Sequence, residues 1–327
     1  MNSHSHSLSS SLAFVCAFAL ILVSSSSSIY VQGLDYDYYD NTCKDFEATV
    51  AGKVREWFKK DKTIAPSLIR LHFHDCSVRG CDASILLNQP GSERTANASK
   101  TLRGFEVIDD IKRTLEKKCP GIVSCADILT AVARDATVFL KGPFWANQYG
   151  RKDGRISLAR EAQQVPMGHE DMTSLIEFYQ SKGLNTIDLI VLSGAHTIGR
   201  SSCAAIQDRL YTYKGSGKPD PSIDPKYLNY LRRKCKNPAN YVDLDATTPD
   251  KFDHQYYTNL EKNMGLLYTD QLLYNDHRTS QLVVTLATQS ELFPYMFSTS
   301  MVKLGGILGD ADDDGEVRLQ CSRVNAY

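Results

Sequence analysis

The spacing of apolar residues constrains the fold of this chain more than any other feature of its sequence. Phe46, Val50, Val54 and Trp57 recur at intervals of three or four residues, which places them on one face of a helix. The same pattern runs through residues 107–115, 125–139, 172–179, 186–192, 252–260 and 281–293. The alternation typical of a half-buried strand is scarce. The pattern predicts an all-α fold with little β structure.

Charge is nearly balanced, since 37 lysines and arginines against 38 aspartates and glutamates give a formal net charge of −1. This balance excludes the strong excess of positive charge that is typical of proteins that bind nucleic acids or anionic membranes. Breaks rich in glycine, proline or asparagine separate the helical segments, and no internal repeat follows residue 28. We therefore expect residues 29–327 to form a single domain, with one helical half ending near residue 150 and a second beginning near residue 168.

The N-terminal segment differs from the rest, because its first 27 residues contain no aspartate, glutamate, lysine or arginine. Its apolar run, Leu12 to Val23, precedes a serine run and is too short to span a bilayer. The pattern is typical of a secretory signal peptide, although a basic start is missing. We expect residues 1–28 to be a signal peptide cleaved between about residues 26 and 33, no membrane span, and a secreted, extracellular protein.

The chain has nine cysteines, and this number is compatible with secretion. Cys16 lies in the apolar leader, which leaves eight, at positions 43, 76, 81, 119, 125, 203, 235 and 321. An even number suits a secreted protein with disulfide bonds. Eight thiols allow roughly 105 pairings, and only Cys76 and Cys81 are close enough in sequence to suggest a local pair.

Residues 70–76 read RLHFHDC and concentrate polar side chains in a short stretch. If residues 63–76 are helical, Arg70 and His74 share a face, while His72 points roughly 200° away from His74. A strand would instead put both histidines on one face, as in zinc hydrolases of the HxHxDH type, but here Asp75 follows His74 directly. We interpret His72 as a core histidine. Arg70 and His74 are either a structural pair or a reactive one.

A second segment that contains a candidate functional residue is DLIVLSGAHTIGR, residues 188–200. Its apolar helical pattern leads into Gly194, Ala195 and the single His196. These small neighbours leave room for something large and flat. A lone histidine is more often structural than a ligand, so spacing alone does not connect His196 with His74.

Four motifs in order, RLHFHDCSVRGCDASILL, VSCADIL, DLIVLSGAHTIGR and TPDKFDHQYY, resemble the class III haem peroxidases, which are secreted by plants. The resemblance covers essentially all of the chain after the leader, including its eight cysteines. It implies a two-lobed, all-α fold that holds haem b between a distal and a proximal helix. It also implies an enzyme that reduces hydrogen peroxide and oxidises phenolic or other aromatic donors by one-electron steps at the haem edge, in cell-wall formation, defence or peroxide removal.

The resemblance also assigns roles around the haem. They are Arg70 as distal cation, Phe73 as distal aromatic residue, His74 as base, Asn97 as the partner that orients the base, His196 as iron ligand, Asp270 as the carboxylate behind it, and Pro166 at the donor entrance. A neutral histidine can act as general base, and a guanidinium stabilises developing negative charge. Asn97 also begins the NAS sequon, and a buried hydrogen-bond partner and a glycosylated surface residue exclude each other.

Two calcium ions are implied by the same resemblance. The distal ligands would be Asp75, Val78, Gly80, Asp82, Ser84 and, through water, Glu93; the proximal ligands would be Thr197, Asp245, Thr248, the main chain of Lys251, and Asp253. The implied disulfides are Cys43–Cys119, Cys76–Cys81, Cys125–Cys321 and Cys203–Cys235. Ser77 and Arg79 stand where the family usually has phenylalanine and asparagine, and Arg79 adds positive charge near the distal cation.

A decoy lies near the end of the chain, where Asp310, Asp312, Asp314 and Gly315 are spaced like the start of an EF-hand loop. The twelfth position would be Cys321 rather than the required glutamate. We interpret this segment as a solvated acidic turn.

Two alternative functions stay open from the sequence. A secreted zinc hydrolase would use His72, His74 and Asp75, and a non-enzymatic protein would bind the cell wall in a calcium-dependent way. A visible spectrum separates the three classes, because only a haem protein shows a Soret band. The leading hypothesis has hydrogen peroxide and small aromatic reductants as partners, no nucleic acid, and a monomeric state.

Overall fold

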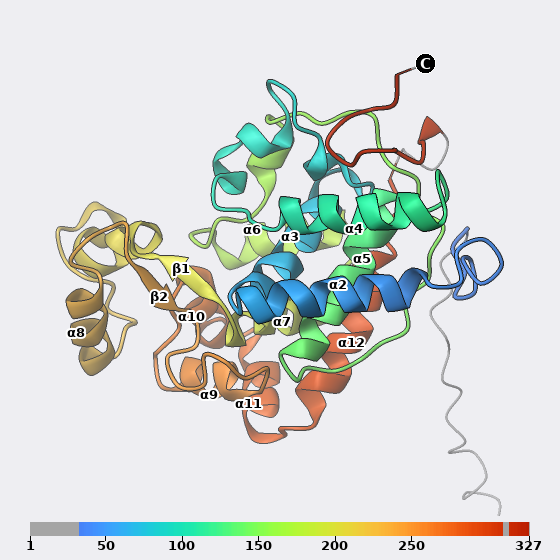
Figure 1. Ribbon diagram of the computed structural model, residues 1–327. Coiled ribbons are helices and arrows are strands. Elements are labelled where there is room, and N and C mark those ends of the chain that lie inside the picture. The colour runs from blue at the N-terminus through green and yellow to red at the C-terminus, as the bar shows by residue number, and fades with distance from the viewer. Residues whose placement is uncertain (1–32, 310–313, 327) are drawn as a thin grey trace, which may run out of the picture. The chain divides into compact units, whose positions relative to one another are not determined.

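The computed structural model describes residues 33–309 and 314–326, which form a mainly helical unit with a minimal sheet (Figure 1). The helices are α2 (Phe46–Lys60), α3 (Ile64–Arg79), α4 (Phe105–Lys118), α5 (Cys125–Phe139), α6 (Met172–Ser181), α7 (Thr186–Ser193), α8 (Pro225–Lys234), α9 (Gln255–Glu261), α10 (Tyr268–Asn275), α11 (Ser280–Thr288) and α12 (Leu292–Gly305). Strands β1 (Arg200–Ser202) and β2 (Tyr241–Asp243) pair antiparallel. The all-α prediction is confirmed.

The predicted helical segments agree with the observed helices except at two boundaries. Residues 281–293 were expected to form one segment, but α11 ends at Thr288 and α12 begins at Leu292. The apolar period continues across this break because both helices bury side chains in the same core, and period alone does not separate consecutive helices. The segment predicted to begin at residue 252 becomes helical only at Gln255, whose N–H donates to the Asp253 carboxylate.

Helix α5 is the centre of the core, since it packs against α2, α3 and α4 (Figure 1). Residues 125–137 of this helix are all buried. Ser124 caps its N-terminus by accepting a hydrogen bond from the Asp127 N–H at 3.1 Å, which satisfies one of the free donors of the first turn. The distal candidate residues lie on α3 and are therefore supported by the best-packed helix of the unit.

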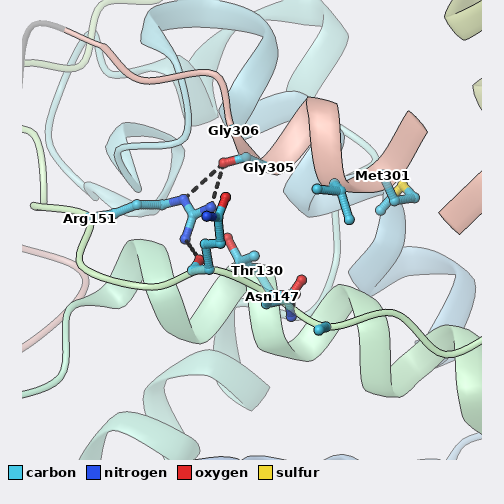
Figure 2. A pocket seen from close by; sticks show the side chains of 9 residues that line it. Thr130, Asn147, Arg151, Met301, Gly305 and Gly306 are labelled. Carbon is cyan, nitrogen blue, oxygen red and sulfur yellow. Dashed lines mark hydrogen bonds between the residues drawn. The ribbon is translucent and has the colours of Figure 1, made fainter. Parts of the chain in front are cut away.

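The loop after α5 is fastened to α12 through Arg151 (Figure 2). The Arg151 guanidinium donates to the Gly305 carbonyl through Nε at 2.9 Å and to the Asp127 carboxylate through Nη1 at 2.8 Å. A cavity of about 10 Å³ lies beside these groups, which is roughly the volume that one water molecule needs. This cavity is too small for an organic substrate, so it does not mark the active site.

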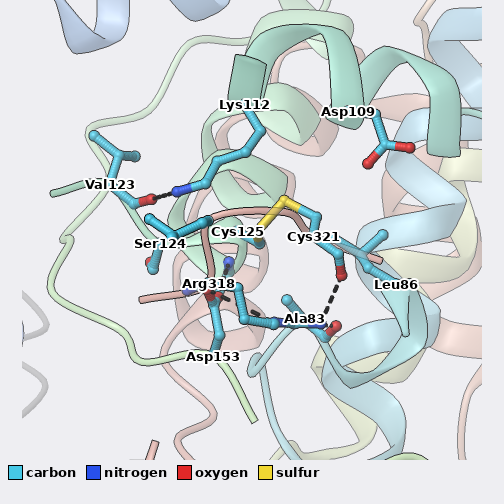
Figure 3. The surroundings of a disulfide bond; sticks show 12 residues. Ala83, Leu86, Asp109, Lys112, Val123, Ser124, Cys125, Asp153, Arg318 and Cys321 are labelled. Carbon is cyan, nitrogen blue, oxygen red and sulfur yellow. Dashed lines mark hydrogen bonds and ion pairs between the residues drawn. A yellow bond between two sulfur atoms is a disulfide. The ribbon is translucent and has the colours of Figure 1, made fainter. Parts of the chain in front are cut away.

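The C-terminal segment holds the loop that follows α3 (Figure 3). Cys321 is disulfide-bonded to Cys125. Arg318 is fully buried, and its Nη2 donates to the Ala83 carbonyl at 2.6 Å. Its main-chain N–H donates to the Asp153 carboxylate at 2.8 Å. The loop that carries Asp82 and Ser84 is therefore anchored by residues far away in the sequence.

The structure contains four disulfides, which are Cys43–Cys119, Cys76–Cys81, Cys125–Cys321 and Cys203–Cys235. This is the pairing that the family resemblance implies. Across the described ranges, no helix combines the length and apolar character needed to cross a bilayer. The expected signal peptide, and Asp310 and Asp312 of the acidic decoy, lie outside the described residues.

Candidate active site

The segment RLHFHDC lies within helix α3, which excludes the strand alternative. His72 is buried and its Nδ1 lies 3.6 Å from Cys76 Sγ. Within the described residues, His72, Cys76 and Cys81 form the one group of three histidine, cysteine or acidic side chains whose ligand atoms all lie within 4.8 Å of one another. Its two sulfurs are bonded to each other and are not thiolate ligands. The zinc-hydrolase hypothesis is therefore wrong.

His74 and Arg70 form the distal part of the candidate site. His74 is only 3% exposed, and burial, with the nearby charge of Arg70, lowers the pKa of its imidazole to about 3. The side chain is consequently neutral near pH 7 and able to accept a proton. Arg70 is accessible, yet the surrounding chain limits its hydration and lowers the pKa of its guanidinium, which still remains charged.

Asn97 does not contact the candidate base in this structure. It lies in the short helix η3 (Asn97–Ser99) and is exposed, and none of the hydrogen bonds among the described residues joins its side chain to His74. The same segment instead reaches Arg70, whose Nη2 donates to the Ala98 carbonyl at 3.1 Å and whose Nη1 donates to Thr101 Oγ1 at 2.9 Å. The exposure of Asn97 suits a sequon better than a buried hydrogen-bond partner.

His196 lies in η5 (Gly194–Thr197), directly after α7. Its Nδ1 is 2.7 Å from Oδ1 of Asp270, a carboxylate on α10 that is 1% exposed. The imidazole itself is 35% exposed, and Nε2 has no hydrogen-bond partner within the described part of the chain. Gly194 is required here because a Cβ at this position would lie 2.3 Å from the Tyr257 hydroxyl.

Tyr179 of α6 connects the surroundings of the two histidines. Its ring centroid lies 6.3 Å from that of Phe73, which neighbours His74. Burial raises the pKa of Tyr179, and a hydrogen bond with Ser193, the last residue of α7, acts in the opposite direction. Helices α3 and α7 also both pack against α12.

The half-buried Pro166 follows directly after Val165. Val165 belongs to a small apolar cluster with Val78 and Ala98, against which Phe73 packs. The segment that carries Pro166 therefore lies beside the distal helix.

Three buried carboxylates, Asp75, Asp82 and Glu93, lie at the distal cation position. Burial raises the pKa of Asp82 to about 6 and that of Glu93 to about 8. Burial also raises the pKa of Asp75 well above its usual range, and the charge of Asp82 adds to this effect. Ser84 lowers the pKa of Asp82 and Glu93, yet neither Ser84 Oγ nor Glu93 Oε2 meets a partner at full hydrogen-bond geometry. Buried and incompletely paired carboxyl oxygens, whose charged forms are disfavoured without a positive partner, suit a hard divalent cation.

The residues Val78, Arg79 and Gly80, at the end of α3, also make contacts that affect the proposed distal cation site. The Val78 carbonyl accepts from Lys182 Nζ at 3.0 Å, and Gly80 ends α3 with a φ of +87°, which favours glycine. Arg79, which departs from the family pattern, is paired with Glu161 through two hydrogen bonds of 2.6 and 2.8 Å. Its positive charge is therefore balanced locally.

The predicted proximal ligands also come together. Thr197 Oγ1 lies 3.4 Å from Asp245 Oδ2, 3.3 Å from the Lys251 carbonyl and 3.5 Å from Asp253 Oδ1. Thr248 Oγ1 lies 2.9 Å from the same Asp253 oxygen. Five residues from two distant segments thus present hydroxyl, carbonyl and carboxylate oxygens to one another, and these are the ligand types that calcium takes.

Several supporting residues were missed from the sequence. A Cβ at Gly154 would lie 2.2 Å from Asp82 Oδ2, so this glycine makes space for a candidate calcium ligand. Arg318 holds the loop after Asp82, and the Tyr256 hydroxyl donates to Asp270 Oδ1 at 3.0 Å. Gly154 and Arg318 belong to none of the motifs identified in the sequence. Tyr256 lies in the TPDKFDHQYY motif, but nothing in that motif indicates that its hydroxyl reaches Asp270.

Comparison with known proteins agrees with this site. A family model described as peroxidase matches residues 50–289. Peroxidase 7 of Arabidopsis thaliana is 56% identical over 296 residues, which cover 90% of this chain and 85% of that protein. Peroxidase N1 of Nicotiana tabacum is 40% identical over 332 residues, 99% of this chain and 100% of the relative. Peroxidase 25 of A. thaliana is 41% identical over 320 residues, 95% and 97% of the two chains.

A helical unit that places a neutral histidine beside a guanidinium on one helix, and a carboxylate-paired histidine on another segment, has the residues that a haem-dependent oxidoreductase requires. The chain belongs to the peroxidase family, among the class III haem peroxidases of plants. It is a peroxidase, which reduces hydrogen peroxide with electrons from a reducing substrate. This membership excludes the non-enzymatic alternative.

The residues present fit the haem that this family uses. His196 combines a ring nitrogen held by a buried carboxylate with a second nitrogen that is free for a metal, the arrangement usual for metal-bound histidines. Asp270 is itself held by the Leu267 N–H at 2.8 Å, which fixes the orientation of the pair.

Proposed function

We propose that this protein is a secreted peroxidase that oxidises phenolic or other small aromatic donors one electron at a time, with a role in the cell wall, defence or peroxide removal. The observation that carries the proposal is the buried His74, whose pKa is lowered by burial and by the charge of Arg70 one helical turn away. A neutral base and a fixed cation on one helix face suit the proton movement and charge stabilisation that peroxide cleavage requires.

Haem, when bound, would supply the iron centre at which hydrogen peroxide is reduced. His74 would accept the proton of one peroxide oxygen. It would then return this proton to the other oxygen, which leaves as water. Arg70 stabilises the negative charge that grows while the O–O bond breaks. Asp270 increases the basicity of His196 by accepting from its Nδ1–H. Two donor molecules each lose one electron and one proton, and the second oxygen leaves as water.

Access of donors is restricted on the distal side. Phe73 is half-buried and packs against Tyr179 and the apolar cluster that contains Val165. It would keep aromatic donors away from the peroxide position. Donors would instead lose electrons at the haem edge near Pro166, which is half-buried next to the exposed Met167. The stepwise loss of single electrons would leave phenoxyl radicals.

We further propose two structural calcium ions, one held by the distal group of Asp75, Val78, Gly80, Asp82, Ser84 and Glu93 and one by the proximal group of Thr197, Asp245, Thr248, Lys251 and Asp253. The unpaired buried oxygens of Ser84 and Glu93 support the distal site. Four disulfides support secretion to the cell wall or medium, because such bonds persist in oxidising compartments. A monomeric state is part of the same proposal.

The role of His74 is tested by His74→Leu. We expect the variant to keep its haem but to react with hydrogen peroxide about 10²- to 10⁴-fold more slowly, the range for a lost general base. Stopped-flow mixing with peroxide measures this rate. His72→Leu is the matched control on the same helix, because His72 is equally buried but contacts the Cys76–Cys81 disulfide instead. A His74→Leu rate within about threefold of wild type would rule out His74 as the base.

The role of Asp270 is tested by Asp270→Asn. A neutral amide makes His196 a weaker electron donor than a carboxylate does. We therefore expect the fold to persist while the ferric/ferrous midpoint potential shifts to a more positive value. Spectroelectrochemical titration measures the shift. An unchanged potential would show that Asp270 does not increase the basicity of His196.

A further inference from the structure

One oxygen of Asp270 serves two partners. Oδ1 lies 2.7 Å from His196 Nδ1 and also accepts from the Tyr256 hydroxyl at 3.0 Å. The other oxygen, Oδ2, accepts from the Leu267 main-chain N–H at 2.8 Å. The carboxylate is 1% exposed and Tyr256 is 2% exposed, so water does not compete for these bonds. The negative charge of Asp270 is therefore divided among three protein groups.

Tyr256 is fixed in this arrangement by its packing. It lies in α9, which contacts both η5 and α10, the two elements that carry His196 and Asp270. Its ring stands edge-on to the imidazole, with centroids 6.2 Å apart and planes at 83°. Burial and the charge of Asp270 raise the pKa of the phenol well above its usual value. The hydroxyl is therefore a donor toward Asp270.

Sharing an acceptor oxygen has a consequence for His196. A carboxylate that is stabilised by one donor attracts the proton of a second donor less strongly, because each hydrogen bond withdraws part of the same charge. We propose that Tyr256 is a positioning residue that limits the basicity of His196, by holding Asp270 Oδ1 in place and withdrawing charge from it. Tyr256 would set the reduction potential of the haem iron without touching the iron. The inference rests on the proposed role of His196 as iron ligand.

The neighbouring residue offers a matched control. Tyr257 follows Tyr256 in α9 and is also completely buried. Its hydroxyl donates to the carbonyls of Ile190 and Val191 at 3.1 and 3.4 Å, so it does not interact with Asp270. Replacing either tyrosine by phenylalanine removes one buried hydroxyl from the same helix and keeps the ring. Only one replacement changes the charge that Asp270 offers to His196.

The experiment compares Tyr256→Phe, Tyr257→Phe and Asp270→Asn in the haem-loaded protein. We expect Tyr256→Phe to move the midpoint potential to a more negative value, so that the ferric-to-ferrous ratio at a fixed applied potential rises by about tenfold, as for the loss of one hydrogen bond to a charged group. The iron–histidine stretching frequency of the ferrous protein, measured by resonance Raman, should rise. Tyr257→Phe should change neither value, and Asp270→Asn should shift both in the opposite direction.

A merely structural role for Tyr256 would give a different result. Loosening Asp270 would weaken its bond to His196 and shift the potential in the positive direction, as Asp270→Asn does, so a positive shift or no shift in Tyr256→Phe overturns the inference. If Asp270→Asn also leaves both values unchanged, the failure lies in the assignment of His196 and Asp270 instead.

Should Tyr256→Phe not fold, 3-fluorotyrosine at position 256 keeps the ring and hydroxyl but donates a stronger hydrogen bond. It should move the potential in the positive direction and lower the stretching frequency. No shift, or a negative one, would overturn the inference.

Discussion

His196→Ala is expected to lose its haem and, with it, the oxidation of aromatic donors. The structure offers His196 as a histidine with one ring nitrogen held by a buried carboxylate and the other free. We expect turnover to fall by more than about 100-fold, because even the outer partners of a metal ligand are worth about 10- to 100-fold. The ratio of Soret to protein absorbance reports haem retention, and donor oxidation at saturating peroxide reports turnover.

Two comparisons make this result specific. His169→Ala is the matched control, because His169 has a 75% exposed side chain and pairs only loosely with Glu170 at 3.9 Å. It should retain both haem and activity. Added imidazole should restore part of the Soret band in His196→Ala, since a free ligand can enter the space that the side chain leaves. A fully active, five-coordinate His196→Ala protein would refute the assignment.

Removal of the distal cation is expected to have the second-largest effect. Asp75 follows His74 directly in α3, so an unbalanced Asp75–Asp82–Glu93 cluster would let the end of the helix relax and misplace the base. We expect Asp82→Asn, or prolonged chelation, to slow the reaction with peroxide without loss of haem. A site filled at a hundred times its dissociation constant contributes about 2.7 kcal/mol, so we expect the Tm of a domain of this length to fall by about 4 °C.

The pH dependence of this effect follows from the raised pKa values. A carboxyl whose pKa is higher in the folded than in the unfolded protein favours folding when protonated, and this contribution is lost as the pH rises. In the calcium-free protein the loss extends from about pH 4 to about 6 for Asp82 and about 8 for Glu93. Chelation should therefore lower the Tm more at pH 8 than at pH 5. An equal or larger drop at pH 5 would contradict the electrostatic account.

The acidic decoy supplies the control for the cation site. Asp314 is exposed, and the spacing of its segment lacks the final glutamate of an EF-hand. Asp312→Asn combined with Asp314→Asn should leave calcium content, peroxide rate and Tm unchanged. Metal analysis beside stopped-flow kinetics on both variants decides the matter. If this variant lost calcium and reacted more slowly with peroxide while Asp82→Asn retained its calcium and its rate, the cation would bind at the acidic segment and not at Asp82.

Sequence reasoning reached the parts of this molecule that are encoded locally. The apolar period predicted α5 to the residue, because each turn of a buried helix repeats the same requirement. The ordered motifs singled out Arg70, His74 and His196, and the structure places the first two on α3 and the third beside Asp270. The helical geometry of residues 70–76 then decided against the zinc alternative, since only a strand puts His72 and His74 on one face.

What sequence reasoning missed depends on contacts between distant segments. Gly154 contacts Asp82 across 72 positions of sequence, and the space it leaves is defined by the fold rather than by its neighbours. Tyr256 lies in a helix rich in tyrosine, and nothing in the order of residues shows which hydroxyl reaches Asp270. Asn97 illustrates the opposite case, because the resemblance places it beside His74, whereas it is exposed and makes no hydrogen bond to His74 among the described residues.

The attachment of Arg318 to the Ala83 carbonyl also limits when the protein can mature. Ribosomes synthesise the chain from the N-terminus, so Ala83 emerges 235 residues before the side chain that anchors it. Cys125 is likewise synthesised 196 residues before Cys321, its disulfide partner. The loop beside Asp82 cannot be completed during synthesis, however early α3 and α5 form. We therefore expect this loop to reach its final geometry only after synthesis, and a nascent chain stalled before residue 318 would hold every proposed catalytic side chain but lack the Arg318 anchor of the loop.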